Sequence, residues 1–167
     1  LLLDRGASIK NLENSGCVPL RTAIKNGSPE MVKLLLDRGA DTEKLDSHGC
    51  VPLHIAIYEG SPEIVKMLLD KKVDVNAKTI RGCSTPLHLA TVRGEDRIVH
   101  LLLEKNPNVN EKDTFGATPL HCATYSCTSE TVNALLHRGA DPKLPDPQKR
   151  TPLHWAELFY RSEEKSF

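Results

Sequence analysis

No stretch of the 167-residue sequence is apolar enough to cross a membrane, because its longest purely apolar runs are three or four residues, whereas a spanning helix needs about 20. The N-terminus also lacks a basic region that leads into an apolar signal core. Net charge is missing too, since 22 basic residues balance 22 acidic ones, whereas a general binder of nucleic acid or of an anionic lipid surface carries a basic excess. The sequence therefore predicts neither membrane insertion nor a nucleic-acid partner.

Signatures of disulfide scaffolds and of enzymes are absent as well. The five cysteines include no CxxC pair, and an odd number in a chain of this size does not describe a disulfide framework. We therefore expect a reducing, intracellular location, either cytoplasmic or nuclear. No GxSxG, GxxxxGK or HExxH motif occurs. From these absences we expect no catalysis, no cofactor, no metal site and no small-molecule substrate in this chain.

What the sequence does contain is a short motif that recurs five times. TPLH occurs three times, and VPLR and VPLH are looser copies, so that the residue before each Pro-Leu pair stands at position 18, 51, 85, 118 or 151. The steps are therefore 33, 34, 33 and 33 residues. Motifs of the LLLDRGA type begin at positions 1, 34, 67, 101 and 134 and keep the same period. Two motifs in phase predict a repeat protein, with the one extra residue between Gly82 and Thr85.

Each repeat carries the signals of two short helices. Proline after Thr or Val suits a first helical position, which predicts first helices that start at Pro19, Pro52, Pro86, Pro119 and Pro152. Glycines that can adopt a left-handed conformation end these helices at 27, 60 and 94 and end the second helices at 39 and 139. Ser28 and Ser61 have the pattern of N-caps. The polar segment that follows each second helix predicts a hairpin-like loop.

These motifs resemble the ankyrin-repeat family, in which each unit is a turn followed by two antiparallel helices. The resemblance implies an all-α ankyrin-repeat solenoid with hairpin-like loops. We expect one domain over 1–167, made of a partial repeat at 1–17, full repeats at 18–50, 51–84, 85–117 and 118–150, and a partial or capping repeat at 151–167. Because the chain begins inside an apolar motif without Met, we expect a monomeric fragment of a longer protein.

Several residues depart from the family pattern. Lys72 and Asn106 stand where the second helix should end in Gly, and Lys149 where the loop should have one. Asn tolerates the left-handed conformation, whereas Lys adopts it at some energetic cost. Cys127 stands where the first helix of its repeat should end in Gly. Near the C-terminus, Glu164 and Lys165 replace apolar residues, so that either a polar cap forms there or the repeat pattern ends.

Histidines recur in register at His54, His88, His121 and His154. A metal ladder would need ligands much closer together, since equivalent positions in stacked repeats lie about a helix diameter apart. We therefore favour hydrogen bonds from each imidazole to the local turn backbone or to the Thr hydroxyl. The same spacing argues against a disulfide between Cys50 and Cys83. Cys122 and Cys127 lie five residues apart beside His121, which leaves a zinc or redox site as an alternative to packing.

The family resemblance also implies a binding surface, because loop tips and outer positions of the first helix line a concave face in ankyrin-repeat proteins. Carried over to this sequence, those positions are Ser47, His48, Tyr58, Glu59, Ile80, Arg81, Arg93, Thr114, Phe115, Tyr125 and Ser126, with Asn14, Ser15, Lys25, Asn26 and Val92 as further members. They include three of the seven aromatic residues, and aromatics and Arg dominate protein interfaces. The alternative for Tyr58 and Phe115 is that each covers a neighbouring repeat. We expect Trp155 to belong to the core.

We therefore predict a non-catalytic module that binds a partner protein or peptide, within a larger scaffold, adaptor or regulatory protein. The alternative is a regulatory or substrate-recruiting segment of an enzyme, such as a kinase or ubiquitin ligase, or of a channel, whose functional domain lies outside this chain. Asn76 and Asn110 each follow Val and lie eight residues after a Leu. That context resembles hydroxylated asparagines of ankyrin repeats, with turn stabilisation as the alternative.

Overall fold

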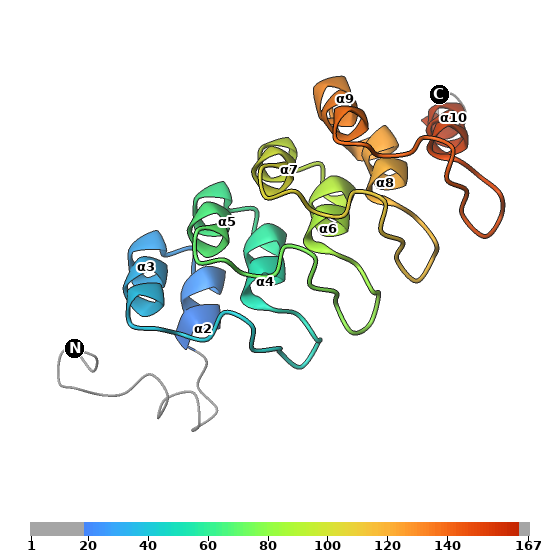
Figure 1. The fold of residues 1–167 in the computed structure, drawn as a ribbon. Helices are drawn as coiled ribbons and strands as arrows, with labels where there is room; N and C mark the ends of the chain where they lie inside the picture. Colours follow the sequence, from blue (N-terminus) through green and yellow to red (C-terminus); the bar gives the residue numbers. More distant parts are fainter. Residues whose placement is uncertain (1–18, 164–167) are drawn as a thin grey trace. The chain divides into compact units, whose positions relative to one another are not determined.

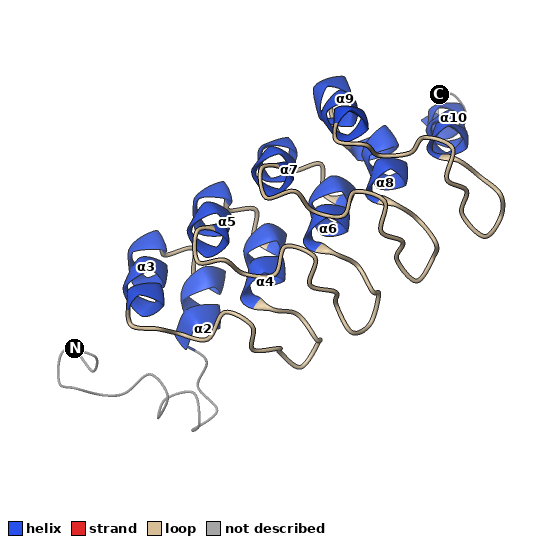
Figure 2. Ribbon diagram, in the orientation of Figure 1, coloured by secondary structure: helices blue, strands red, loops and turns tan. Residues whose placement is uncertain are grey.

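A computed structural model of the chain describes residues 19–163 and places side chains as far as Leu158 (Figure 1). Within that range nine helices are joined by loops, and no strand occurs (Figure 2). The first helices of the repeats are α2 (Pro19–Lys25), α4 (Pro52–Tyr58), α6 (Pro86–Val92), α8 (Pro119–Ser126) and α10 (Pro152–Glu163). The second helices are α3 (Pro29–Asp37), α5 (Pro62–Leu69), α7 (Asp96–Leu103) and α9 (Ser129–His137).

Some sequence predictions fall on residues outside this range. They are the partial repeat at 1–17, the partner positions Asn14 and Ser15, and the polar cap at Glu164 and Lys165. The predicted starts of the five first helices at proline are confirmed. Of the two predicted serine caps, Ser61 accepts a hydrogen bond from the Ile64 N–H at 3.4 Å, whereas Ser28 holds the cap position without a side-chain bond.

The helix ends depend on a left-handed backbone, as predicted. Lys72 and Asn106 adopt it with φ of 60° and 51° although neither is glycine, and Lys149 adopts it in its loop with φ of 62°. Cys127 does not adopt it. Its φ is −105° and its ψ is 163°, so α8 runs to Ser126 and ends in an extended residue instead of a left-handed one. The first helix of this repeat therefore ends without the left-handed residue that ends the other first helices at Gly27, Gly60 and Gly94.

Each loop closes on itself like a hairpin, although no strand forms. The Asp113 N–H donates to the Ala117 carbonyl at 3.0 Å, and the Asp113 carboxylate accepts the Phe115 and Ala117 N–H groups at 2.9 and 3.0 Å. In the loop with the extra residue, the closing bond runs from the Thr79 N–H to the Ser84 carbonyl at 3.0 Å. The hairpin-like loops and the site of the insertion are therefore confirmed.

The contacts within the chain group it into two compact units, residues 1–74 and 75–167. In unit 1, α2 packs on α3 and α4, and α5 packs on α3 and α4. Its largest fully buried side chains are Leu20, Ile24, Leu35, Leu53, Ile57, Ile64 and Leu68. Burial of each such side chain contributes about 1.5–3 kcal/mol relative to exposure, which is how helices of seven to nine residues are stabilised.

Unit 2 repeats the same scheme. Helix α8 packs between α6 and α10, and α7 packs on α6 and α9. Its largest fully buried side chains are Leu87, Ile98, Leu102, Leu120 and Leu135. Leu153 of α10 occupies the position of Leu87 and Leu120 but is 66% exposed, because no helix after α10 covers it within the described residues.

Gly94, two residues after the end of α6, lies against the C-terminal end of α8. Its φ is +66°, and a Cβ atom added there would overlap the carbonyl oxygen of Ser126 at the end of α8. The Ser126 hydroxyl in turn donates to the carbonyls of Thr91 in α6 and Cys122 in α8. Gly139 has a φ of +88° but nothing within 4 Å of such a Cβ atom. A substitution at Gly139 would therefore cause backbone strain alone, whereas one at Gly94 would add a steric clash between repeats.

We predict that Gly139→Ala lowers the free energy of unfolding by about 1 kcal/mol, through backbone strain alone. Gly94→Ala should lower it by about 2–4 kcal/mol, because the methyl group also forces α6 and α8 apart. Urea denaturation followed by circular dichroism measures both. Equal losses in the two variants would show that α6 and α8 are not in close contact at Gly94.

Candidate functional site

The loops of unit 2 are held in place by buried histidines. His88 Nδ1 accepts the Thr85 N–H at 3.2 Å and lies 2.9 Å from the Thr85 hydroxyl oxygen. A backbone N–H can only donate, so the ring proton sits on Nε2, which donates to the Ala117 carbonyl of the next loop at 3.1 Å. His121 repeats this arrangement with Thr118 and with the Arg150 carbonyl. The predicted local bond is confirmed for His88, for His121 and, through Thr151, for His154. The bond to the next loop was not predicted.

These bonds hold the loop that carries Thr114 and Phe115 and the loop that follows it. In unit 2, Ile80 and Phe115 at two loop tips are 68% and 75% exposed, and Arg81 and Arg93 are also exposed. Thr114 lies between the loops, where its N–H and hydroxyl both donate to the Gly82 carbonyl at 3.1 and 3.3 Å. The loop tips are therefore neighbours that present large apolar and cationic side chains to solvent.

The remaining predicted residues divide between exposed and structural positions. In unit 1, the six predicted residues that the structure describes are all exposed, namely Lys25, Asn26, Ser47, His48, Tyr58 and Glu59. In unit 2, Tyr125 and Ser126 are half-buried. The Ser126 hydroxyl is occupied by the two carbonyls already described, whereas the Tyr125 ring forms part of a surface hollow.

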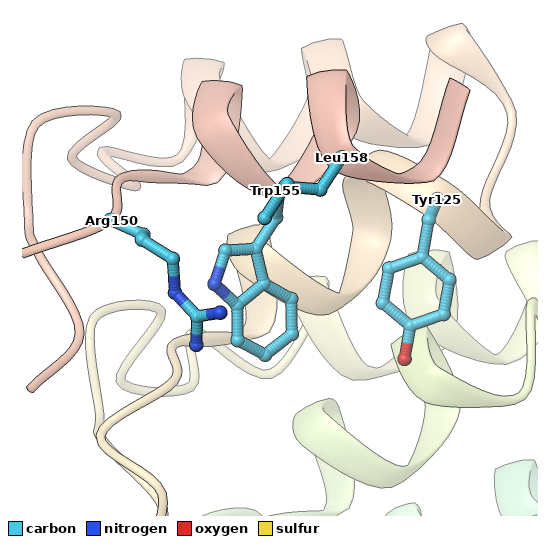
Figure 3. Close-up of a pocket in the computed structure, with 4 residues that line it drawn as sticks. All are labelled: Tyr125, Arg150, Trp155 and Leu158. Carbon is cyan, nitrogen blue, oxygen red and sulfur yellow. The ribbon is translucent and has the colours of Figure 1, made fainter. Parts of the chain in front are cut away.

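That hollow is an open cavity of about 420 Å³ lined by Tyr125, Arg150, Trp155 and Leu158. Figure 3 shows the Trp155 indole between the Arg150 guanidinium and the Tyr125 ring. The Tyr125 and Trp155 ring centroids are 6.3 Å apart with their planes tilted by 33°, and the Arg150 guanidinium carbon lies 5.6 Å from the Trp155 ring centroid. Leu158 is 52% exposed. An aromatic, an aliphatic and a cationic wall thus surround one cavity.

The expectation that Trp155 belongs to the core is wrong, because it is only partly buried. Its indole N–H donates to Asp146 Oδ2 at 3.0 Å, and the ring meets His121 edge-on with centroids 5.3 Å apart. Asp146 and His121 therefore hold the indole in place, and the ring also lines the hollow. Sequence reasoning also missed Leu158 and Arg150. Leu158 lies 33 residues after Tyr125, so the repeat register contained the signal for it.

Asp146 organises the back of the hollow. Its carboxylate accepts the Gln148 and Arg150 N–H groups at 2.9 and 2.8 Å, and the Arg150 Nε at 2.7 Å, in addition to the Trp155 indole. Burial raises the pKa of Asp146, but the hydrogen bonds from Arg150 and Trp155 outweigh burial and hold that pKa well below its usual range. Asp146 is therefore ionised at neutral pH and fixes both side chains.

The surroundings of Cys122 and Cys127 do not favour a zinc or redox site. Burial raises the pKa values of the Cys122 and Cys127 thiols to about 12 each, so that both are protonated at neutral pH and are poor nucleophiles and metal ligands. The Cys127 thiol lies 3.5 Å from the Thr91 carbonyl oxygen. Within the described residues, no group of three or more His, Cys, Asp or Glu is placed to hold a metal ion. These contacts favour packing for both cysteines.

The two asparagines with a hydroxylation-like context both bridge repeats of unit 2. Asn110 donates to the Gly139 carbonyl at 2.9 Å and accepts the Asp141 N–H at 2.8 Å. Asn76 accepts the Asn108 N–H at 2.8 Å. These bonds favour turn stabilisation, and hydroxylation of either residue stays a prediction.

The fold and its loops define a class of repeat protein, built from stacked helix pairs with projecting hairpin-like loops. The family model of ankyrin repeats (three copies) matches residues 1–79 and again residues 80–146. The chain therefore belongs to the ankyrin-repeat family, whose repeats are generally protein–protein interaction modules. A comparison with curated proteins finds no match. None of the helices in the described part of the chain is long and apolar enough to span a bilayer.

The histidine links predict a pH dependence of stability. Burial lowers the pKa values of His88 and His121 below the ordinary value, although their carbonyl partners oppose this effect. Below about pH 6.5 the unfolded chain therefore takes up protons that the folded chain does not. The stability contributed by the neutral imidazoles is present above that pH and is lost as the pH falls further.

We expect the free energy of unfolding to decrease between about pH 7.5 and pH 5, measured by urea denaturation. The double variant His88→Gln/His121→Gln should be less stable at the higher pH and should depend less on pH. His137→Gln, at an exposed position of α9, is the control and should keep the dependence of the wild type. A double variant with an unchanged pH dependence would contradict the assignment.

Proposed function

We propose that this chain is the protein-binding module of a larger scaffold, adaptor or regulatory protein, and that it binds its partner through the loop tips and first helices. The observation that carries the proposal is the exposure of large apolar side chains on loops that are themselves fixed, Ile80 and Phe115 above all. Exposed apolar groups on a rigid support are typical of binding surfaces. Neither side chain is needed to bury the helices.

A second observation concerns the first helices. One helical position is Lys25, Tyr58, Val92, Tyr125 and Leu158 in successive repeats. Tyr58 and Val92 are 61% and 47% exposed although each directly follows a buried residue, and Leu158 is 52% exposed. Because packing does not require a large apolar or aromatic residue at an exposed position, the exposed Tyr58, Val92 and Leu158 support recognition of a partner.

The electrostatic character of the positions in unit 2 also fits a protein partner. Arg81 and Arg93 are exposed there, and Arg is enriched at interfaces because its planar group can donate several hydrogen bonds and stack on rings. The chain as a whole carries no net charge, so these cations support local recognition and not general attraction of a polyanion.

The test uses a quadruple variant, Tyr58→Ala/Arg81→Ala/Phe115→Ala/Tyr125→Ala. Tagged wild-type chain should capture a partner protein from a lysate of cells in which the protein is naturally expressed. The variant should capture about 100-fold less of that partner, as expected when several interface anchors are removed. Circular dichroism should show unchanged helical content.

The matched control replaces four exposed residues of the second helices, Met31, Lys66, Arg97 and Asn133, by Ala. It should capture the partner as well as the wild type does. If the quadruple variant keeps its partner and the control loses it, the binding surface lies on the second helices and the proposed one is wrong.

A further inference from the structure

Of the four residues that line the hollow, Tyr125, Arg150, Trp155 and Leu158, two are held in a fixed arrangement by other side chains. The indole of Trp155 is held by Asp146 through its N–H and by the ring of His121 at its edge. Arg150 is held by Asp146 through Nε at 2.7 Å and Nη2 at 2.6 Å. A ligand would therefore immobilise few side chains when it binds, which lowers the entropic cost of binding. The volume of the hollow, about 420 Å³, falls in the range of ligand-binding pockets.

The polar chemistry of the hollow comes from the guanidinium of Arg150. Its bonds to Asp146 and to Gln148 use Nε and Nη2, and Nη1 has no partner among the described residues. Nη1 therefore has two N–H donors that no described residue uses and that an acceptor in the hollow can bind. The Asp146 side chain is fully enclosed, so it presents no carboxylate to the hollow. The hollow thus offers hydrogen-bond donors and a cation beside aromatic and aliphatic walls.

We infer that this hollow binds a peptide segment of the partner protein in which a bulky apolar side chain lies next to a carboxylate. The apolar side chain packs between Trp155, Tyr125 and Leu158, and the carboxylate accepts hydrogen bonds from Nη1 of Arg150. Charge-assisted bonds of this kind are stronger than neutral ones, and burial beside the rings strengthens them further. A basic segment is disfavoured because the charged residue among the four that line the hollow is the cation Arg150. The inference rests on the proposed function and names the chemistry of its partner.

The test pans a phage-displayed library of random dodecapeptides on the full chain. The enriched sequences should place Leu, Ile, Met or an aromatic residue beside Asp or Glu. Synthetic peptides of these sequences should shift the tryptophan fluorescence, which reports on the hollow directly because the chain has a single Trp. Replacing the peptide's acidic residue by its amide should weaken binding by about tenfold.

Two leucines of α10 provide a matched pair of variants. Leu158→Asp places a carboxylate in the hollow and should lower the affinity for the acidic peptide by about tenfold or more. Leu153→Asp makes the same change at an exposed position of the same helix that does not line the hollow, and should leave the affinity unchanged. Arg150→Gln should abolish the preference for the acidic peptide over its amide, with urea denaturation to confirm that the variant folds.

Other outcomes overturn the inference. Enriched peptides that are basic, or that lack a carboxylate, would contradict the assigned chemistry. Acidic peptides that bind Leu158→Asp as well as the wild type would place the site elsewhere. If Phe115→Ala instead lowers the affinity for these peptides, the proposed function stands, and only the assignment of the hollow as their binding site is wrong. A library that yields no enriched peptide also overturns the inference, while the capture experiment judges the proposed function separately.

Discussion

Burial of short helices against their neighbours is the interaction on which the rest of the structure depends. Eight of the nine described helices have nine residues or fewer, and helices of that length are not stable alone in water. Side chains such as Leu53, Ile64, Leu87 and Leu120 are almost completely enclosed only because one helix pair covers the next within each unit. Because packing depends on these buried positions, the exposed loop tips and outer positions of the first helices remain available for the proposed recognition of a partner.

Much of the fold could be predicted from local chemistry. Proline at a first helical position and glycine at a helix end act over one or two residues, which is why Pro86 and Gly94 mark α6 correctly. Cys127 shows the limit of such signals, because without glycine α8 ends in an extended residue that the local pattern does not specify. Lys72 shows the converse, since its backbone is left-handed with φ of 60° although its side chain disfavours that conformation.

The candidate site was only partly predictable, for a physical reason. Tyr125 and Leu158 share a register, so periodicity locates both. Arg150 and Trp155 have no periodic signal, because their orientation depends on the buried carboxylate of Asp146. The bond from His88 Nε2 to the Ala117 carbonyl is likewise a contact between residues 29 positions apart. Local sequence patterns do not contain such contacts, although these contacts hold the loops in place.

The most direct test of this account is to express residues 85–117 alone, as one complete repeat, and to compare its circular dichroism with that of the full chain. The account predicts that the isolated repeat has little helix and no cooperative thermal transition, because its apolar faces have no neighbour to cover them. An isolated repeat that is helical and melts cooperatively would contradict the claim that burial between repeats holds the structure together.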